Sequence, residues 1–131
     1  MRAAPTRITR RPRVATLPWS KEAEPMKVDL TSLMAELKEG LQTLYGDRLK
    51  GLYLFGSYAR HEADEESDVD VLVVLDRVDN YSQEIDRTGQ MVSVLSLEHG
   101  VTISRVFATE QRWLEDQTMF FLNVREEAVP V

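Results

Sequence analysis

Apolar residues recur every three or four positions in the stretch that follows residue 28, which predicts an amphipathic helix. Asp29 or Thr31 can cap the N-terminus of this helix, and Gly46 marks its end. Its apolar stripe, which we expect to face the core, consists of Leu30, Met34, Leu37, Leu41 and Leu44.

Two short apolar runs follow, over residues 49–55 and 68–75, and each predicts a β-strand. A short helix is predicted between them, over residues 57–63. Only twelve residues separate Phe55 from Asp68, which is barely enough for a parallel crossover, so we expect antiparallel neighbours. Both faces of the second strand are apolar beyond its two aspartates, which predicts a central strand. One face carries Asp68, Asp70, Leu72 and Val74, and the other Val69, Val71, Val73 and Leu75.

The second half of the chain predicts a long helix over residues 79–99, a third strand over 101–108 and a helix over 110–117 that Thr109 can cap. Residues 120–131 have a mixed pattern, with a candidate strand in the last four positions. The predicted buried side of the long helix consists of Ile85, Met91, Val92, Leu95 and Leu97. This alternation of helices and strands is typical of an α/β domain with a small central sheet.

The first 25 residues differ in composition from the rest of the chain. They contain four prolines and show neither helical nor strand periodicity. We therefore predict a disordered extension over residues 1–25 and a single domain over residues 26–131. Met26 is a candidate start of the natural protein.

The formal charge of −6 is unevenly distributed. The first 26 residues carry six basic against two acidic side chains, or +4, which leaves −10 for the remaining 105 residues. Binding of a nucleic-acid backbone needs clustered Lys and Arg, so we expect no direct nucleic-acid binding by the domain.

The chain has no cysteine, which excludes disulfides, thiolate zinc sites and a thiol nucleophile. His61 and His99 have no ligand partners at metal spacing and are expected to be surface residues. No apolar run approaches the roughly 18 residues of a membrane span, and the basic N-terminal segment lacks the apolar core of a secretory signal. An arginine-rich transit peptide is the alternative interpretation of that segment. We expect a cytoplasmic protein with no membrane partner.

Two aspartates at the start of a buried strand need compensation, because Asp is disfavoured in strands and an unpartnered buried carboxylate is costly. Antiparallel strands would place Gly56 and Ser57 beside Asp68 and Asp70. Gly56 lets a phosphate approach the backbone, while Ser57 and the N–H groups that open the short helix can donate to its oxygens. Magnesium, which takes one or two carboxylates plus substrate phosphates, can lie between the aspartates. The pattern therefore predicts phosphoryl or nucleotidyl transfer.

These residues resemble the signature of the minimal nucleotidyltransferases, small members of the polymerase-beta-like nucleotidyltransferase superfamily. Gly56-Ser57, ten residues and Asp68-Val69-Asp70 match the Gly-Ser, ten, Asp-x-Asp motif of that family. The resemblance covers residues 28–131 and includes Leu52-Tyr53-Leu54-Phe55, Ala59-Arg60, Ser67 and the ending Phe121-Leu122-Asn123-Val124-Arg125-Glu126-Glu127.

The resemblance implies a nucleotidyltransferase fold, with a small mixed central β-sheet flanked by helices, and transfer of AMP from ATP with two Mg²⁺ ions. Carried over by position, Gly56 and Ser57 hold the triphosphate, and Asp68 and Asp70 are the catalytic metal ligands. Arg60 is a further candidate for phosphate binding. Such proteins are similar to antitoxins that bind a HEPN-type ribonuclease toxin and AMPylate it on tyrosine. A HEPN-type toxin is therefore the expected partner, in a hetero-oligomer.

The superfamily places a third carboxylate on a later strand, commonly as the base that activates the attacking hydroxyl. Here the matching position is Ser104, with Thr102 as its same-face neighbour, and neither residue is acidic. Glu110, just after the strand, is the alternative source of this carboxylate, which must come within hydrogen-bonding reach of the proton. A second hypothesis is therefore a binding module that keeps the fold without the chemistry and neutralises its partner by occlusion.

Other side chains near the motif have two interpretations each. Arg60 either contacts phosphate or pairs with Glu65 or Glu66 across the loop. Tyr58 either stacks on a nucleobase or packs in the core. The two aspartates themselves are either metal ligands or solvated residues at the start of a strand.

Overall fold

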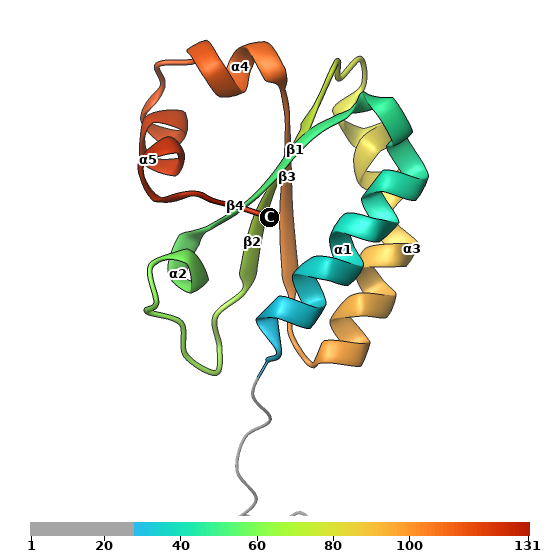
Figure 1. Cartoon of the computed structure of the whole chain (residues 1–131), viewed down its shortest axis with the longest axis vertical. Coiled ribbons are helices and arrows are strands. Elements are labelled where there is room, and N and C mark those ends of the chain that lie inside the picture. Colours follow the sequence, from blue (N-terminus) through green and yellow to red (C-terminus); the bar gives the residue numbers. More distant parts are fainter. Residues whose placement is uncertain (1–27) are drawn as a thin grey trace, which may run out of the picture.

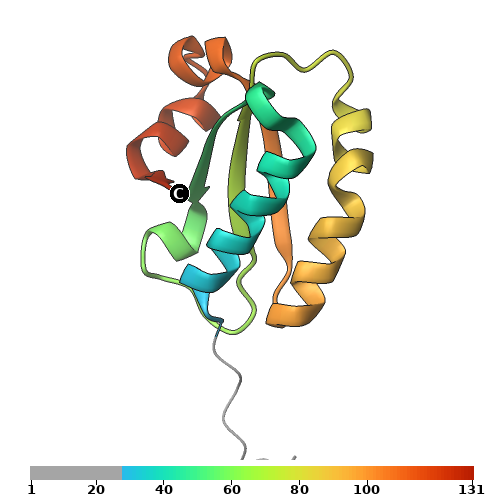
Figure 2. The same cartoon turned by 45° about the vertical axis from the view of Figure 1, so that its right-hand side comes forward.

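The computed structural model describes residues 28–131, so the predicted extension over residues 1–25 and the candidate start at Met26 lie outside the described part. The described elements are α1 (Leu30–Tyr45), η1 (Gly46–Arg48), β1 (Leu49–Phe55), α2 (Gly56–Ala59), β2 (Val69–Leu75), α3 (Tyr81–His99), β3 (Ile103–Thr109), α4 (Glu110–Glu115), α5 (Met119–Glu127) and β4 (Val129–Pro130). These residues form a four-stranded sheet of order β3-β2-β1-β4. Helices α1 and α3 cover one face of the sheet, and α4 and α5 cover the other (Figures 1 and 2).

The sheet is mixed, as predicted. β1 and β2 are antiparallel neighbours, with Phe55 opposite Asp70, which confirms the inference from the short connection. β2 and β3 are parallel and joined through α3. β4 pairs antiparallel to the outer edge of β1, where Tyr53 faces Pro130, and this confirms the candidate strand at the end of the chain. The predicted fold class, a small mixed sheet flanked by helices, is confirmed.

β2 is the central strand because its side chains fill both cores. Leu72 and Val74 pack with Phe121 and Val124 of α5 on one face. The other face packs under α1 and α3, and it consists of Val69, Val71, Val73 and Leu75. All six aliphatic side chains are at most 1 % exposed. Burial of this strand on both faces fixes the position of the residues at its ends.

Two residues predicted to be buried are exposed. Leu44 at the end of α1 is 41 % exposed, and Leu97 near the end of α3 is 84 % exposed. In α1 the buried stripe runs at a spacing of four, and Tyr45 takes the place that Leu44 was predicted to fill. The buried stripe of α1 includes Leu33, Leu37, Leu41 and Tyr45. Leu97 lies in the last turn of α3 and extends into solvent, so the prediction that it belongs to the buried side of that helix is wrong.

Element boundaries also differ from the prediction. The short helix α2 ends at Ala59, and His61 has a φ of 60°, a left-handed conformation that stops the helix before residue 63. Asp68 precedes β2 rather than belonging to it. The largest difference is α5, a helix in a stretch whose pattern of apolar and polar residues is mixed. None of the helices in residues 28–131 is both long and apolar enough to cross a membrane.

Candidate active site

The turn from β1 into α2 places Gly56 against the side chain of Asp70. Gly56 has a φ of +76°, and a Cβ built at this position would lie 2.2 Å from Oδ2 of Asp70. The contact follows from the register of the antiparallel strands, in which Phe55 pairs with Asp70. Both the backbone conformation and the close approach therefore require glycine at position 56.

The two aspartates lie two positions apart at the start of β2. Asp70 is half-buried, on the side of the sheet that α4 and α5 cover, and Asp68 is exposed just before the strand. Burial raises the pKa of Asp70, the negative charge of Asp68 raises it further, and Arg60 opposes both effects. A half-buried carboxylate beside a second carboxylate is the kind of donor set that a hard cation compensates.

The backbone N–H of Gly56 is not free, because the carboxylate of Glu127 accepts it. Gly56 N lies 2.6 Å from Oε2 of Glu127, at the end of α5. Arg60 Nη1 donates to the same carboxylate, at 3.1 Å to Oε1 and 3.3 Å to Oε2. One carboxylate thus binds a backbone amide and a guanidinium that are both predicted to bind phosphate.

Arg60 pairs with different acids from those that the sequence predicted. Its Nε donates to Oε1 of Glu62 at 3.1 Å, and its Nη1 contacts Glu127. Neither Glu65 nor Glu66 is among its described partners, so that predicted pairing is wrong. The hydrogen bonds that Arg60 donates to Glu62 and then to Glu127 raise the pKa of Arg60, so the guanidinium stays charged.

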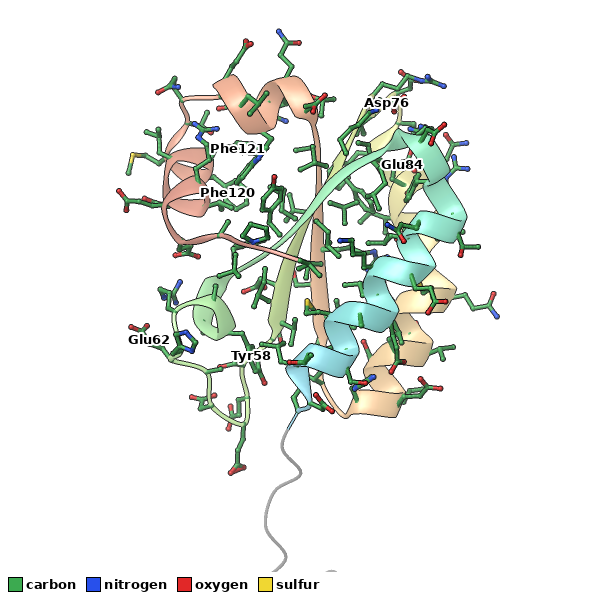
Figure 3. The ribbon with its side chains drawn as sticks, viewed as in Figure 1. Tyr58, Glu62, Asp76, Glu84, Phe120 and Phe121 are labelled. Atoms are coloured by element: carbon green, nitrogen blue, oxygen red, sulfur yellow. The ribbon has the colours of Figure 1, made fainter. Side chains whose placement is uncertain are left out.

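A cavity of about 460 Å³ lies between these groups and α5. The predicted site residues Gly56, Ser57, Arg60 and Asp70 line one side of it. The other side comes mainly from α5, where the ring of Phe120 packs edge-on against Phe55 at a centroid distance of 5.9 Å (Figure 3). The α5 residues that line the cavity are Phe120, Asn123, Val124, Glu126 and Glu127.

Sequence reasoning missed the contribution of α5. Phe121 and Val124 are buried and separated by three positions, a helical signal. Three further apolar residues, Met119, Phe120 and Leu122, are exposed and obscured that periodicity. Glu127 lies in the family-like ending of the sequence, but only the fold brings it to Gly56.

A second cavity, of about 480 Å³, lies on the other side of the aspartates. Asp68 lines this cavity, whereas Asp70 lines the first one, so the acidic pair lies between two hollows. Thr102 borders the second cavity, and its carbonyl accepts the N–H of Val69 at 2.9 Å. The remaining lining residues are Glu65, Glu66, Ser67, Ser96, Leu97, Gly100 and Val101.

The position beside Asp70 on β3 is a serine. Ser104 is the direct partner of Asp70 in the parallel ladder, where the sequence placed it. Glu110 follows Thr109, which pairs with Leu75 at the other end of β2, so it lies six positions, or about 20 Å, from Ser104. The prediction that Glu110 could supply the third carboxylate is therefore wrong.

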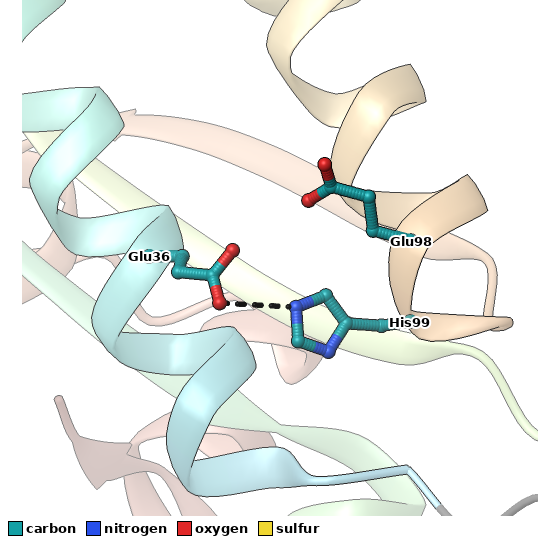
Figure 4. Close-up of side chains that lie close together, drawn as sticks. All are labelled: Glu36, Glu98 and His99. Carbon is teal, nitrogen blue, oxygen red and sulfur yellow. Dashed lines mark ion pairs between the residues drawn. The ribbon is translucent and has the colours of Figure 1, made fainter.

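The aromatic and histidine predictions have mixed outcomes. Tyr58 is half-buried and packs against the main core cluster, which favours the packing interpretation over nucleobase stacking. His61 is exposed, as predicted. His99 was predicted to have no ligand partners, but its Nε2 lies 3.4 Å from Glu36 of α1, and Glu98 is close to both (Figure 4). The contact between His99 and Glu36 joins the last residue of α3 to the middle of α1 and lies outside both cavities.

The fold and these residues define a nucleotidyltransferase. Residues 34–119 match the protein family described as nucleotidyltransferase domain, and the chain belongs to this family. The predicted identification as a nucleotidyltransferase is confirmed. Two proteins of Methanocaldococcus jannaschii, each named "putative protein adenylyltransferase", are similar to the chain. One is 34% identical over 93 residues, covering 70% of this chain and 87% of the relative. The other is 33% identical over 79 residues, covering 60% and 79%.

Solved structures share the fold. A putative minimal nucleotidyltransferase has a TM-score of 0.51 at 25% identity and covers 78% of this chain and 91% of its own. A putative nucleotidyltransferase from Sulfolobus solfataricus has a TM-score of 0.55 at 19% identity, with 76% of each chain covered. A toxin–antitoxin crystal structure with AMP-PNP has a TM-score of 0.53 at 18% identity and covers 79% of this chain and 72% of its own.

Proposed function

We propose that this chain transfers AMP from MgATP to a hydroxyl group of a partner protein, a HEPN-type toxin that it neutralises in the cytoplasm. The main support is the contact between Gly56 and Asp70. It places a backbone N–H that can donate a hydrogen bond to phosphate, and a carboxylate that can bind a metal ion, at the edge of one cavity. The names of the two curated relatives support a protein as the acceptor. The likeness to a toxin–antitoxin structure supports a toxin as the partner.

Asp68 and Asp70 would hold the magnesium ions, of which two are expected. The donor set fits, because the two carboxylates are two positions apart and the pKa of Asp70 is raised by burial and by the charge of Asp68. When bound, magnesium neutralises the developing charge on the transferred phosphate. The residues of the chain then serve to orient the nucleotide.

In the proposed transfer, the acceptor oxygen forms a bond to the α-phosphorus of ATP, and the bond from that phosphorus to the oxygen bridging to the β-phosphate breaks. Pyrophosphate leaves with that oxygen. The N–H of Gly56, the hydroxyl of Ser57 and the guanidinium of Arg60 hold the phosphate oxygens. Because Ser104 lies where a carboxylate base would be, the hydroxyl proton passes to water or to a carboxylate of the acceptor protein.

The acceptor is proposed to enter through the second cavity, beside Asp68 and Thr102. In-line transfer needs the acceptor and the leaving pyrophosphate on opposite sides of the α-phosphorus. The cavity lined by Gly56 and Arg60 would hold the pyrophosphate, so the cavity on the other side of the aspartates is left for the acceptor. Glu65, Glu66 and Asp68 make this entrance acidic, which suits a tyrosine within a basic segment.

A second candidate function is neutralisation of the partner by occlusion alone. Ser104 in register with Asp70 favours it, because the described residues place no carboxylate at that position. The two candidates differ in their dependence on Asp68 and Asp70, which the occluding module does not need for chemistry.

The test is the intact mass of the protein that copurifies with this chain, measured before and after incubation with ATP and Mg²⁺. We expect a gain of one or more AMP units with the wild-type chain and none with the double variant Asp68→Asn/Asp70→Asn. Asp86→Asn is the matched control, because Asp86 is exposed on α3 and lies outside both cavities.

A mass gain that persists in the double variant would contradict the assignment of the two aspartates. A stable complex with no gain for the wild type, together with full neutralisation of the partner, would instead establish the occluding module.

A further inference from the structure

We propose that Glu127 is an internal competitor of the nucleotide, with its carboxylate in the position that a phosphate group of the substrate takes. This inference rests on the proposed function, and it concerns a residue that determines how tightly the nucleotide binds. Its basis is the double contact of one carboxylate with the N–H of Gly56 and the guanidinium of Arg60.

The contacts of Glu127 are those of an anion in an anion site. A carboxylate and a phosphate both offer paired oxygen atoms to N–H donors, and both form short charge-assisted hydrogen bonds. Here the distance from Gly56 N to Oε2 is 2.6 Å, and both carboxylate oxygens lie within 3.3 Å of Arg60 Nη1. Gly56 is buried, so its N–H has little access to water when Glu127 is in place.

Nucleotide and Glu127 cannot share these donors. The single N–H of Gly56 makes one strong hydrogen bond, so a phosphate oxygen that accepts it must replace Oε2 of Glu127. A carboxylate left in place would also repel the phosphate, and it already raises the pKa of Asp70 through its charge. Nucleotide binding therefore requires Glu127 to move away from Gly56.

Glu127 is placed so that this movement is local. It is the last residue of α5, its side chain is 22 % exposed, and it borders the cavity of about 460 Å³. Rotation of its side chain about its own bonds would release both donors without unfolding the helix. The N–H of Gly56 and the guanidinium of Arg60 together form an anion site, called the cradle below. Until the side chain of Glu127 rotates, the cradle is closed to phosphate, and the apparent affinity for the nucleotide is lower than that of an open cradle.

A purely structural role for Glu127 predicts the opposite result. If the carboxylate served only to hold Arg60 and the turn at Gly56 in a conformation ready for phosphate, its removal would disorder the cradle and weaken nucleotide binding. Competition predicts tighter binding. The sign of the change in Kd therefore distinguishes the two roles.

The test is titration calorimetry of MgATP and of inorganic tripolyphosphate with wild-type protein and with Glu127→Gln. We expect the Kd of both ligands to fall about three- to tenfold in Glu127→Gln, a range set by the modest strength of partly exposed ion pairs. Glu126→Gln is the matched control, because Glu126 precedes Glu127, lines the same cavity and is absent from the described contacts of Gly56 and Arg60. It measures the general effect of removing one negative charge beside the cavity.

The proposal would be overturned by an unchanged or higher Kd for MgATP in Glu127→Gln, or by an equal fall of this Kd in Glu126→Gln. In either case, binding of MgATP by the wild type would still support the nucleotide site of the proposed function. No binding of MgATP by any of these proteins would overturn the proposed function as well. If Glu127→Gln does not fold, the wild type is titrated with MgATP while NMR follows the Gly56 amide and the Glu127 carboxyl carbon. Both signals must shift together, and a shift of Gly56 alone contradicts the displacement of Glu127.

Discussion

At the scale of single residues, Asp70 is a carboxylate at a position where the fold disfavours its negative charge in the absence of a cation. Its position opposite Phe55 brings it against Gly56, and burial together with the charge of Asp68 raises its pKa. The folded protein therefore binds the proton of Asp70 more tightly than the unfolded chain does. The stability that this proton supplies is lost as the pH rises from the unfolded pKa through the raised folded pKa.

Asp70→Asn is expected to stabilise the metal-free protein near neutral pH, because it removes an ionised carboxylate that the fold disfavours. The gain in the free energy of unfolding should reach up to about 1 kcal/mol after allowance for solvent screening. Urea unfolding of both proteins from about pH 7 to about pH 4 measures it, and the difference should shrink towards the acidic end. Added Mg²⁺ should stabilise the wild type more than the variant. A variant less stable than the wild type at neutral pH would contradict this account.

At the scale of elements, the sequence predicted the strands better than the ends of the helices. The three-residue to four-residue spacing and the buried run of β2 are local signals, and they placed α1, β1, β2, α3 and β3 to within two residues at their ends. The motif residues Gly56 and Asp70 also meet as predicted, because antiparallel pairing follows from the short connection. The sequence could not predict that α5 turns back over the sheet, since that position depends on contacts with residues far away in the chain.

Arg125 is the residue that joins α5 to α4. Its guanidinium donates to the carbonyl of Trp113 at 2.6 Å and to the carbonyl of Asp116, both at the end of α4. Arg125→Lys cannot reproduce this fork, so we expect the free energy of unfolding to fall by about 1–3 kcal/mol. Urea unfolding measures it, with Arg77→Lys as the control because Arg77 is 63 % exposed. A loss no larger than that of the control would show that α5 is held by its apolar face alone.

At the scale of the whole molecule, the site and a buried polar network occupy opposite ends of the sheet. Tyr45 donates to Oε1 of Glu84 at 2.6 Å, and Arg87 donates to the same oxygen at 3.1 Å. Glu84 is only 3 % exposed, so its carboxylate takes its polar contacts from these partners rather than from solvent. Asp70 lies at the first end of β2, whereas this network borders the last end, where Arg48 pairs with Asp76.

Tyr45→Phe is therefore expected to lower stability without changing the site. Loss of the hydrogen bond to buried Glu84 should reduce the free energy of unfolding by about 1–3 kcal/mol. The Kd for MgATP, measured below the unfolding transition, should stay at the wild-type value. A change in Kd as large as that of Glu127→Gln would show that the two ends of the sheet are coupled.

The pairing of β4 with β1 has a consequence for the folding of the protein during its synthesis. Residues up to Thr109 contain β1, β2 and β3, so the contact between Gly56 and Asp70 can form on the ribosome once these strands have emerged. Glu127 and β4 are synthesised afterwards and must find β1 across most of the chain. A chain that folds in this order forms the anion site of Gly56 and Arg60 before Glu127 is made, and the site is then open to other anions in the interval between the two.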